Sequence, residues 1–378
     1  MYERSLNERK GEYDWPLMAA VVGLVFIGTA FIFSATDIHG GLGVPWYRQV
    51  YLHQVAWYVL GAGAAAAVCR LKYGSLARWS AVFYWSTIVM LLSVYAVGAV
   101  HHGGKRWIDL GWFSLQPSEF AKIAFILWLA NYLSRPLEEL RRGKVLATVV
   151  GYTLAPFVLI LKEPDLGSAL VFLAISLAMM FAAGVPQRTL AGLVGAMGLV
   201  AVLGTGLVLF APARFKIVEP YQKTRLLTYF GHGKSYNVEQ ALISIGSGGL
   251  TGKGWRRGTQ HSLGFLPIAG AHNDFIFSVI AEEEGFVGSV GVLALYTVLL
   301  FRGIKIASQA RDRLGQLMAI GVVTLLFSHV FINIGMNIRL MPVTGIPLPL
   351  VSYGGSSVIC SLVAIGILHN VHIHRRYY

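Results

Sequence analysis

The amino-acid sequence predicts an all-α polytopic membrane protein with about ten transmembrane helices and one long extracytoplasmic loop. Of the 378 residues, 55% are hydrophobic and 13% are charged, whereas soluble domains contain about 25% charged residues. A soluble fold cannot bury this much apolar surface, so a lipid bilayer must solvate much of the chain. The apolar residues also form runs of about 18 to 25 residues, which is the length that crosses a bilayer as a helix.

Ten apolar runs are predicted to span the membrane. The first follows a basic leader that contains Arg4, Arg9 and Lys10. It is too long for the apolar region of a signal peptide and further runs follow, so we expect it to remain as a helix. The predicted helices are Trp15–Ala35, His53–Cys69, Trp79–Val100, Pro117–Leu133, Val145–Leu161, Gly167–Gly184, Thr189–Ala211, Phe275–Phe301, Leu314–Asn337 and Ser356–His372.

The basic residues of the short connections predict that both termini are cytoplasmic. Lys and Arg are concentrated in the leader, in the connections 70–78, 134–144 and 302–313, and in the C-terminal tail, while the alternate short connections contain one or two each. Short cytoplasmic loops carry such an excess. It also explains the net charge of +13 without nucleic acid as a partner. The two cysteines, Cys69 and Cys360, are too few for a disulfide framework.

Residues 212–274 are too polar to cross the membrane and lie on the outer side in this topology. Long loops in compact proteins are usually functional or disordered. The aromatic residues of this loop and a helix-like run at Val238–Ile245 favour an ordered structure. Its glycine-rich stretches 231–235 and 248–254 do not match the spacing of a nucleotide-binding P-loop, although their N–H groups could hold a lipid-linked pyrophosphate. The whole chain, 1–378, is thus predicted to be one membrane domain with this loop inside it.

Charged residues inside membrane helices are costly and are therefore functional candidates. The segment Gln116–Lys122 begins a predicted helix with Pro117 at its first position. Glu119 and Lys122 are three residues apart, so their side chains share a face and can pair. A buried structural ion pair combined with a helix cap is the alternative interpretation.

Two short segments on the outer side contain further candidates. Lys105 and Arg106 could together hold a phosphate or pyrophosphate. Trp107 could stack on a sugar, although anchoring at the membrane interface is the commoner use of tryptophan. Asp165 precedes a helix start, so an N-cap would explain it as well.

Asp274 lies where the long polar loop enters the membrane, directly after His272 and Asn273. A carboxylate in such a place is partly desolvated and becomes a better proton acceptor near neutrality. A helix cap is again the alternative. Two turns later, the span contains three acids, Glu282–Glu284. We do not expect all of them to face lipid, so some of them must line a cavity or form pairs.

His329, Asn333 and Asn337 recur every four residues on the ninth predicted helix and form one polar stripe. Such a stripe commonly binds helices together, and this is the interpretation that we favour. The sequence shows no His, Cys and Asp set with metal-ligand spacing and no Ser-His-Asp set.

Five stretches of the sequence together resemble the SEDS family (shape, elongation, division and sporulation). Each is weak alone, but they follow the family order and span most of the chain. Gly258–Gln260 and Thr344–Pro349 are similar to the elongation branch of the family. The segment Leu266–Asn273 departs from the usual family pattern, because an acidic residue is absent and two residues are inserted. The five stretches are Gly103–Lys122, Glu163–Ala169, Tyr236–Gly254, His272–Gly288 and Pro342–Ser357.

The resemblance implies an inverting peptidoglycan glycosyltransferase. Its donor would be a disaccharide-pentapeptide on undecaprenyl pyrophosphate (lipid II), or a growing glycan on the same carrier. Asp274 would be the catalytic base for the attacking hydroxyl. Basic residues would neutralise the leaving pyrophosphate, and a divalent cation (Mg²⁺ or Mn²⁺) could share that role, although we see no dedicated cage for it. The candidate substrate-binding residues are Lys105, Arg106, Trp107, Gln116, Glu119, Lys122, Asp165, Arg225, Gln240, Lys253, Arg256, Gln260, His272, Ser352 and Ser356.

The resemblance also implies partners and a location. The family's partner is a class B penicillin-binding protein, a transpeptidase with one membrane helix, alongside other membrane proteins of the elongation complex. The location would be the bacterial inner (plasma) membrane. A flippase for lipid II is one alternative function, but we detect no internal repeat and the charged motifs crowd the outer face. A scaffold that only positions the transpeptidase is another, and it leaves the placement of Asp274 unexplained.

Overall fold

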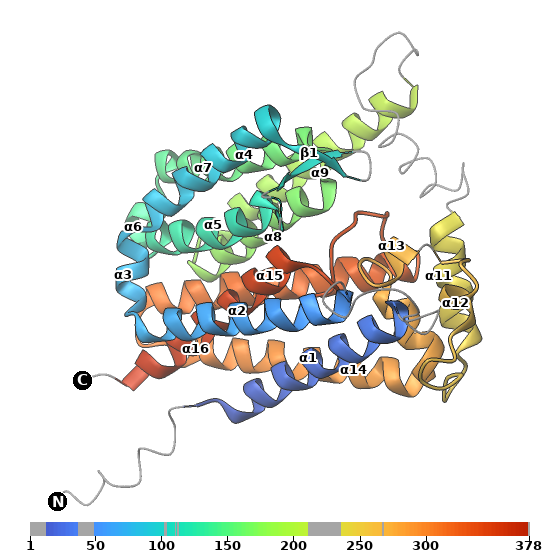
Figure 1. The fold of residues 1–378 in the computed structure, drawn as a ribbon. Helices are drawn as coiled ribbons and strands as arrows, with labels where there is room; N and C mark the ends of the chain where they lie inside the picture. Colours follow the sequence, from blue (N-terminus) through green and yellow to red (C-terminus); the bar gives the residue numbers. More distant parts are fainter. Residues whose placement is uncertain are drawn as a thin grey trace, which may run out of the picture.

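The computed structural model describes residues 13–36, 49–101, 104–109, 111, 113–210, 236–266 and 268–376. Its long helices run side by side in one bundle (Figure 1). All ten predicted helices are confirmed, with shifts of a few residues at most ends, except that α14 continues to Ser308 beyond its predicted end at Phe301. They are α1 (Trp15–Thr36), α2 (Val50–Arg70), α4 (Ser80–Val97), α5 (Pro117–Leu133), α7 (Gly143–Lys162), α8 (Leu166–Ala182), α9 (Gln187–Phe210), α14 (Ile276–Ser308), α15 (Arg313–Asn337) and α16 (Gly355–Ile373).

Among the described residues, seven helices are long and apolar enough to cross a membrane, namely α1, α2, α7, α9, α14, α15 and α16. Helices α4 and α8 are apolar but shorter, and α5 has 17 residues. A helix of that length measures about 26 Å, which is close to the hydrocarbon thickness of about 30 Å. The all-α polytopic fold that the sequence predicts is therefore confirmed.

A small antiparallel sheet follows α4, where the sequence predicted that the helix would continue to Val100. The helix ends at Val97, because Gly98 adopts an extended conformation (φ −64°, ψ 135°). The chain then forms β1 (Ala99–His101), β2 (Gly104–Asp109) and β3 (Ser114–Leu115) in the order β1-β2-β3. Strand β2 carries Lys105, Arg106 and Trp107, so these candidate residues lie on a hairpin.

Short helices connect the long ones or belong to the outer loop. Helix α11 confirms the helix-like run predicted at Val238–Ile245. Helices α11, α12 and α13 gather at one end of the bundle, on the right in Figure 1. The short helices are α3 (Tyr73–Arg78), α6 (Leu137–Leu140), α11 (Tyr236–Ser247), α12 (Thr259–Ser262), α13 (Ile268–Ala271) and η3 (His374–Arg376).

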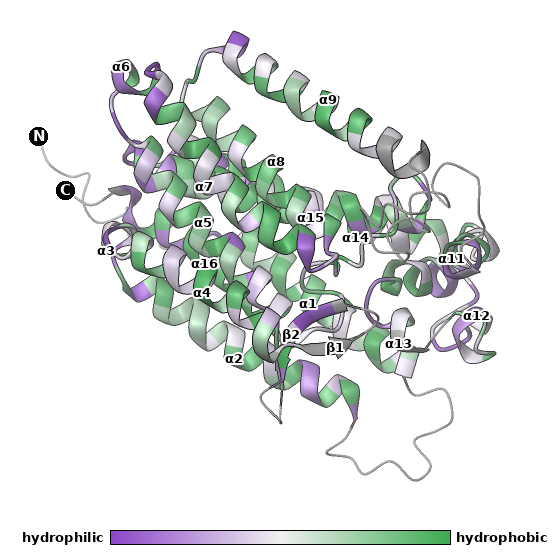
Figure 2. Cartoon of the chain, turned by 90° about the horizontal axis from the view of Figure 1, so that it is seen from above, coloured by the Kyte–Doolittle hydropathy of each residue, from purple (hydrophilic) through white to green (hydrophobic). Residues whose placement is uncertain are grey.

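Helices α15 and α16 form the centre of the bundle. Helix α15 packs against α5, α8, α14 and α16, and α16 packs along α2. Glycines permit this last approach, because a Cβ at Gly61 would lie 2.6 Å from Leu362 Cδ1. By contrast, only 6% of the α9 span is buried within the protein, and α9 lies at the edge of the bundle (Figure 2). We conclude that the apolar side chains of α9 face lipid.

The start of α1, the later part of α14 and the end of α16 meet at the other end of the bundle. Arg302 donates to both carboxylate oxygens of Asp14 through Nε, at 2.9 and 3.0 Å, and to Oδ2 through Nη2 at 2.5 Å. His372 Nδ1 lies 4.0 Å from the same carboxylate oxygen. The start of α1 and the end of α16 therefore lie at the same end of the bundle, opposite α11–α13 (Figure 1).

Candidate active site

Asp274 lies two residues before the start of α14, and its main chain is held by α15. Its carbonyl oxygen accepts hydrogen bonds from Asn333 Nδ2 and Asn337 Nδ2, both at 3.0 Å. The side chain is half-buried and lies beside Gly345, where a Cβ would be 3.4 Å from Asp274 Oδ2. Gly345 has φ +77°, a conformation that glycine adopts without strain. The segment 342–353 therefore lies directly beside the Asp274 carboxylate.

This segment also holds the two residues that precede Asp274. Ser352 Oγ donates to the carbonyl of Asn273 at 2.6 Å and accepts from Leu348 N at 2.8 Å. The main-chain N–H of Tyr353 donates to the carbonyl of His272 at 2.9 Å, and the rings of these two residues meet edge to face at 5.4 Å. Of the predicted site residues, the structure thus brings His272, Asp274 and Ser352 together.

Glu119 and Lys122 form the ion pair that their spacing predicts. Lys122 Nζ lies 2.7 Å from Glu119 Oε1 and 2.8 Å from Nε2 of His329 on α15. Lys122 is fully buried, and Glu119 and His329 are 4% and 3% exposed. The structure therefore adds a third member, His329, to the pair.

The polar stripe of α15 connects this ion pair to Asp274. Residues four apart lie one above the other on a helix, about 6 Å apart along its axis. His329 contacts Lys122, while Asn333 donates to the carbonyls of Asp274 and Ile346, the latter at 2.8 Å. Asn337 Oδ1 also accepts from Ser278 Oγ on α14 at 2.5 Å. The stripe does bind helices together, as predicted, and it also links two candidate sites that are far apart in the sequence.

The start of α5 meets the start of α16. The main-chain N–H of Gln116 donates to Ser356 Oγ at 3.1 Å, and this hydroxyl approaches the carbonyl of Ser114 at 3.4 Å. Gln116 and Ser356 are both buried. Strand β3 is thereby joined to α16, just before the buried helix α5 that carries Glu119 and Lys122.

Arg106 joins the β-hairpin to the turn between α7 and α8. Its Nε donates to the carbonyl of Glu163 at 2.9 Å, and its Nη2 donates to the carbonyl of Pro164. In the same turn Asp165 accepts from Ser168 N at 3.0 Å and occupies the N-cap position of α8. Lys105, next to Arg106, is exposed. The Lys105 cation of the hairpin is therefore exposed to solvent, while Arg106 binds the hairpin to the turn between α7 and α8.

Glu163 is the one titratable group of this turn with a strongly shifted pKa. Its side chain is buried, at 3% exposure, and burial raises its pKa to about 8. The neighbouring Asp165 carboxylate adds to this shift, and the Arg106 guanidinium opposes it. Oε1 of Glu163 has no hydrogen-bond partner among the described residues. At neutral pH we therefore expect the group to be largely protonated.

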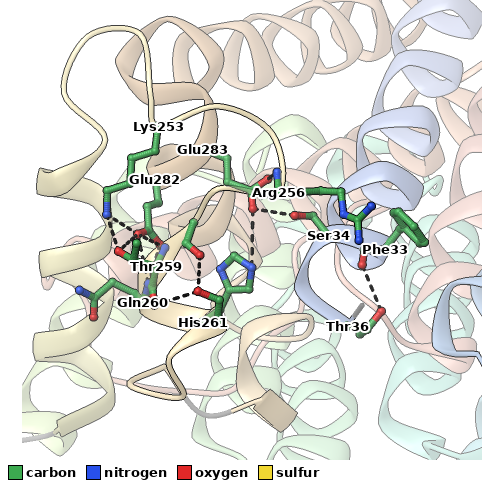
Figure 3. A network of polar contacts seen from close by, with 12 residues as sticks. Phe33, Ser34, Thr36, Lys253, Arg256, Thr259, Gln260, His261, Glu282 and Glu283 are labelled. Carbon is green, nitrogen blue, oxygen red and sulfur yellow. Dashed lines mark hydrogen bonds and ion pairs between the residues drawn. The ribbon is translucent and has the colours of Figure 1, made fainter. Parts of the chain in front are cut away.

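Lys253, Arg256 and Gln260 surround two acids at the start of α14 (Figure 3). Glu282 Oε1 lies 2.5 Å from Lys253 Nζ and accepts from the main-chain N–H of Gln260 at 3.2 Å. Glu283 accepts from Arg256 N at 3.0 Å. The prediction that some of these acids form pairs is confirmed for Glu282, which pairs with Lys253. The Lys253 charge is thereby largely offset by Glu282.

A break in α14 lets the outer loop bind to Glu282 and Glu283. Gly285 has φ 66° and ψ −158°, so the helical hydrogen bonds are interrupted around it. The carbonyls of Glu282 and Glu283 instead accept from Lys253 N at 3.0 Å and Gly254 N at 2.8 Å. Both the main chain and the side chains of these acids therefore hold the outer loop.

The remaining predicted site residues lie on other elements or outside the described part. The Arg256 guanidinium lies over the ring of Phe33 on α1, 5.0 Å from its centre. Gln240 is half-buried on α11. Trp107 is half-buried on β2. Arg225 and the glycine-rich stretch 231–235 lie outside the described residues.

Sequence reasoning did not assign His329, Asn333 or Asn337 to the site. Their four-residue spacing was a signal, but it indicated only that the three side chains share a face. Ser278 and Gly345 gave no signal of their own. Their places depend on contacts between segments that the sequence separates.

These features define a polytopic helical membrane protein whose buried ion pair and carboxylate converge at one end of the bundle. The chain matches the sequence model of the cell cycle protein family FtsW/RodA/SpoVE over residues 15–377, and it therefore belongs to this family. The resemblance to SEDS proteins is confirmed.

Relatives and solved structures agree with this assignment. The peptidoglycan glycosyltransferase MrdB of Escherichia coli K12 is 39% identical over 309 residues, which cover 79% of each chain. The peptidoglycan glycosyltransferase RodA of Treponema pallidum is 32% identical and covers 95% of this chain and 97% of its own. The crystal structure of the rod shape determining protein RodA of Thermus thermophilus is 31% identical, with a TM-score of 0.69 and coverage of 97% and 98%. A chain from a peptidoglycan synthase complex that coordinates polymerisation and crosslinking is 31% identical, with a TM-score of 0.77 and coverage of 96% and 98%.

Proposed function

We propose that this chain is a peptidoglycan glycosyltransferase that polymerises lipid II into glycan strands during cell elongation. Relatives that match most of the chain are named for this activity. The observation that carries the proposal is the placement of Asp274. Its main chain is fixed by two asparagines of α15, and the same stripe leads to the buried Glu119–Lys122 pair. A base and a cation are the two groups that this transfer requires.

In the proposed reaction, Asp274 is the general base. A sugar hydroxyl of the acceptor attacks the anomeric carbon of the donor, and a new glycosidic C–O bond forms with inversion. The bond from that carbon to the lipid pyrophosphate breaks, and the pyrophosphate leaves with the electron pair. Asp274 accepts the hydroxyl proton. A base contributes most when it is held in place, and the two asparagine hydrogen bonds support this role for Asp274.

The leaving pyrophosphate needs positive charge. We propose Lys122 and Lys105 as its first partners, because Lys105 is exposed on the hairpin and Lys122 is connected to Asp274 through the α15 stripe. Arg106 donates to main-chain carbonyls, which are neutral, so it keeps its positive charge beside Lys105. Within the described residues, no cluster of three His, Cys, Asp or Glu could hold a metal ion.

The partner and the orientation complete the proposal. We propose a class B penicillin-binding protein as the partner, because a structural neighbour belongs to a complex that coordinates polymerisation and crosslinking. Other membrane proteins of the elongation complex would join them in the bacterial inner membrane. We also propose that the bundle end with Asp14 and Arg302 is cytoplasmic. The end with Asp274, the hairpin and α11–α13 then faces outward, where a flipped lipid II presents its sugars.

Reconstitution tests this function. The purified chain, alone and with a class B partner, is incubated in lipid nanodiscs with fluorescent lipid II, and glycan products are separated by length. We expect polymer in the presence of the partner. A folded chain that yields no polymer, and instead moves lipid II across liposome membranes, would overturn the proposal in favour of a flippase.

A further inference from the structure

The imidazole of His329 connects Lys122 to the segment beside Asp274. Its Nε2 lies 2.8 Å from Lys122 Nζ, and the ring also hydrogen-bonds the backbone of Pro347. Proline has no main-chain N–H, so the contact uses the Pro347 carbonyl and the ring must be the donor. Pro347 belongs to the segment 342–353 that lies against Asp274.

These two contacts determine which nitrogen carries the proton. Lys122 forms a buried ion pair with Glu119 at 2.7 Å, so it is an ammonium, and an ammonium can only donate hydrogen bonds. His329 Nε2 therefore accepts and carries no proton. The proton is on Nδ1, which donates to the carbonyl of Pro347. The ring is then the neutral Nδ1-protonated tautomer.

We propose that His329 is a positioning residue for glycosyl transfer, which aims the Lys122 ammonium and ties it to the segment beside Asp274. This inference rests on the proposed function. An ammonium has three N–H donors. Glu119 and His329 take two of them, which leaves the third for an oxygen of the leaving pyrophosphate.

The geometry explains why Lys122 needs a second partner. Lysine has a flexible four-carbon side chain, and one partner alone leaves the direction of the remaining N–H groups undetermined. His329 is anchored at both nitrogens and lies on the same face of α15 as Asn333, which holds Asp274. Residues on one face of α15 therefore contact both the cation, Lys122, and the proposed base, Asp274. A displacement of about 1 Å at such a site can lower a rate on the order of 10²-fold.

Three substitutions separate the two hydrogen bonds of His329. His329→Gln places an acceptor near the position of Nε2 and keeps the contact with Lys122. His329→Asn places its amide near the position of Nδ1 and keeps the contact with Pro347 alone. His329→Phe removes both at similar volume. His53→Gln, at an exposed histidine of α2, is the matched control.

The variants are compared for polymerisation of lipid II and for melting temperature in nanodiscs. We expect His329→Gln and His53→Gln to retain kcat within about threefold. His329→Asn and His329→Phe should lose kcat by about 10- to 100-fold, with KM for lipid II nearly unchanged, because the lost contact acts on the transition state. Equal activity of His329→Gln and His329→Phe at equal melting temperature would overturn the proposal.

A second measurement does not depend on activity or on the folding of every variant. Histidine in the wild-type chain is labelled with ¹⁵N, and the His329 signals are assigned by their loss in whichever His329 variant folds. We expect the Nδ1-protonated tautomer at neutral pH. An Nε2-protonated or doubly protonated ring would overturn the inference even if the chain polymerises lipid II. Failure of the wild-type chain to polymerise would instead count against the proposed function.

Discussion

Asn333 on α15 and Asp274 before α14 are joined directly, because Nδ2 of Asn333 donates to the main-chain carbonyl of Asp274 at 3.0 Å. Asn337 donates to the same carbonyl from one turn further along α15. A carbonyl oxygen accepts two hydrogen bonds, so the two amides satisfy it fully. The position of Asp274 is therefore set by contacts from α15 as well as by the start of α14, which it precedes.

Asn333→Leu should weaken both the fold and the activity. It leaves the carbonyl of Ile346, which accepts from Asn333 at 2.8 Å, without that donor. Loss of one partner of a buried hydrogen bond costs about 1–3 kcal/mol. We expect a lower melting temperature and a fall of roughly tenfold or more in polymerisation. Asn131→Leu, at an exposed position of α5, is the control, and a fully active Asn333→Leu would show that Asp274 needs no such anchor.

Glu163→Gln should change stability in a pH-dependent way. The folded-state pKa of Glu163 is raised from 4.5 to about 8, so the folded state retains a proton that the unfolded state releases. The stability that this group contributes is present below pH 4.5 and is lost between pH 4.5 and about 8. Glutamine stays neutral throughout, so Glu163→Gln should gain melting temperature relative to wild type as the pH rises from 5 to 8. Glu138→Gln, at an exposed acid, should show no such trend, and a pH-independent difference for Glu163→Gln would contradict the shifted pKa.

Glu282 should be the main anchor of the outer loop. Its carboxylate accepts from Lys253 Nζ and from the main-chain N–H of Thr259 at 2.7 Å. Glu282→Gln removes the charge that these donors share, at a cost of about 1–3 kcal/mol. We expect faster proteolysis within residues 250–262, and a smaller effect from Lys253→Met because its side chain is partly exposed. Equal proteolysis rates for Glu282→Gln and Glu284→Gln would refute the anchor.

The proposed topology predicts opposite labelling at the two ends of the bundle. Leu250 is 72% exposed in the outer loop, and Glu138 is exposed on α6. A membrane-impermeant maleimide should label Leu250→Cys in intact cells and Glu138→Cys only after permeabilisation. Wild-type chain is the control, since Cys360 is buried and Cys69 is half-buried. The reverse pattern would invert the topology.

The sequence was sufficient for the long helices, because a run of apolar residues has to become a helix in lipid whatever surrounds it. The sequence was misleading after α4, where the helix was predicted to continue to Val100, because apolar residues such as Val97 and Val100 suit the end of a helix as well as a strand. The Glu119–Lys122 pair was predictable because both residues lie on one helix turn. Its contact with His329 was not, since 207 positions separate Lys122 from His329.

Contacts between segments that are distant in the sequence also determine which partners single residues bind. Arg106 looked like an anion-binding residue, but two of its N–H groups donate to the turn that holds Glu163. Asp165 does make the N-cap that the sequence offered as the plain explanation. Residue type and spacing restrict the possible contacts, and only the packing of α5, α15 and the segment 342–353 selects among them.

Asp274→Asn tests the proposed base most directly. Asparagine keeps the size of the side chain and leaves the main-chain carbonyl available to Asn333 and Asn337, so the fold should be retained. Its amide cannot accept the proton of the acceptor hydroxyl. Because a positioned base contributes about 10²- to 10⁴-fold, the variant should make little or no polymer from lipid II. It should keep the wild-type melting temperature and should still bind the class B partner.

The comparison with Asp165→Asn makes the result specific. Asp165 is a carboxylate in the same part of the molecule, but its Oδ1 accepts from Ser168 N as a helix cap, a contact that asparagine can also make. We therefore expect Asp165→Asn to retain most of the activity that Asp274→Asn loses. Near-normal polymerisation by Asp274→Asn would rule out this residue as the base. Suspicion would then move to Glu119, whose carboxylate is joined to the α15 stripe through Lys122 and His329.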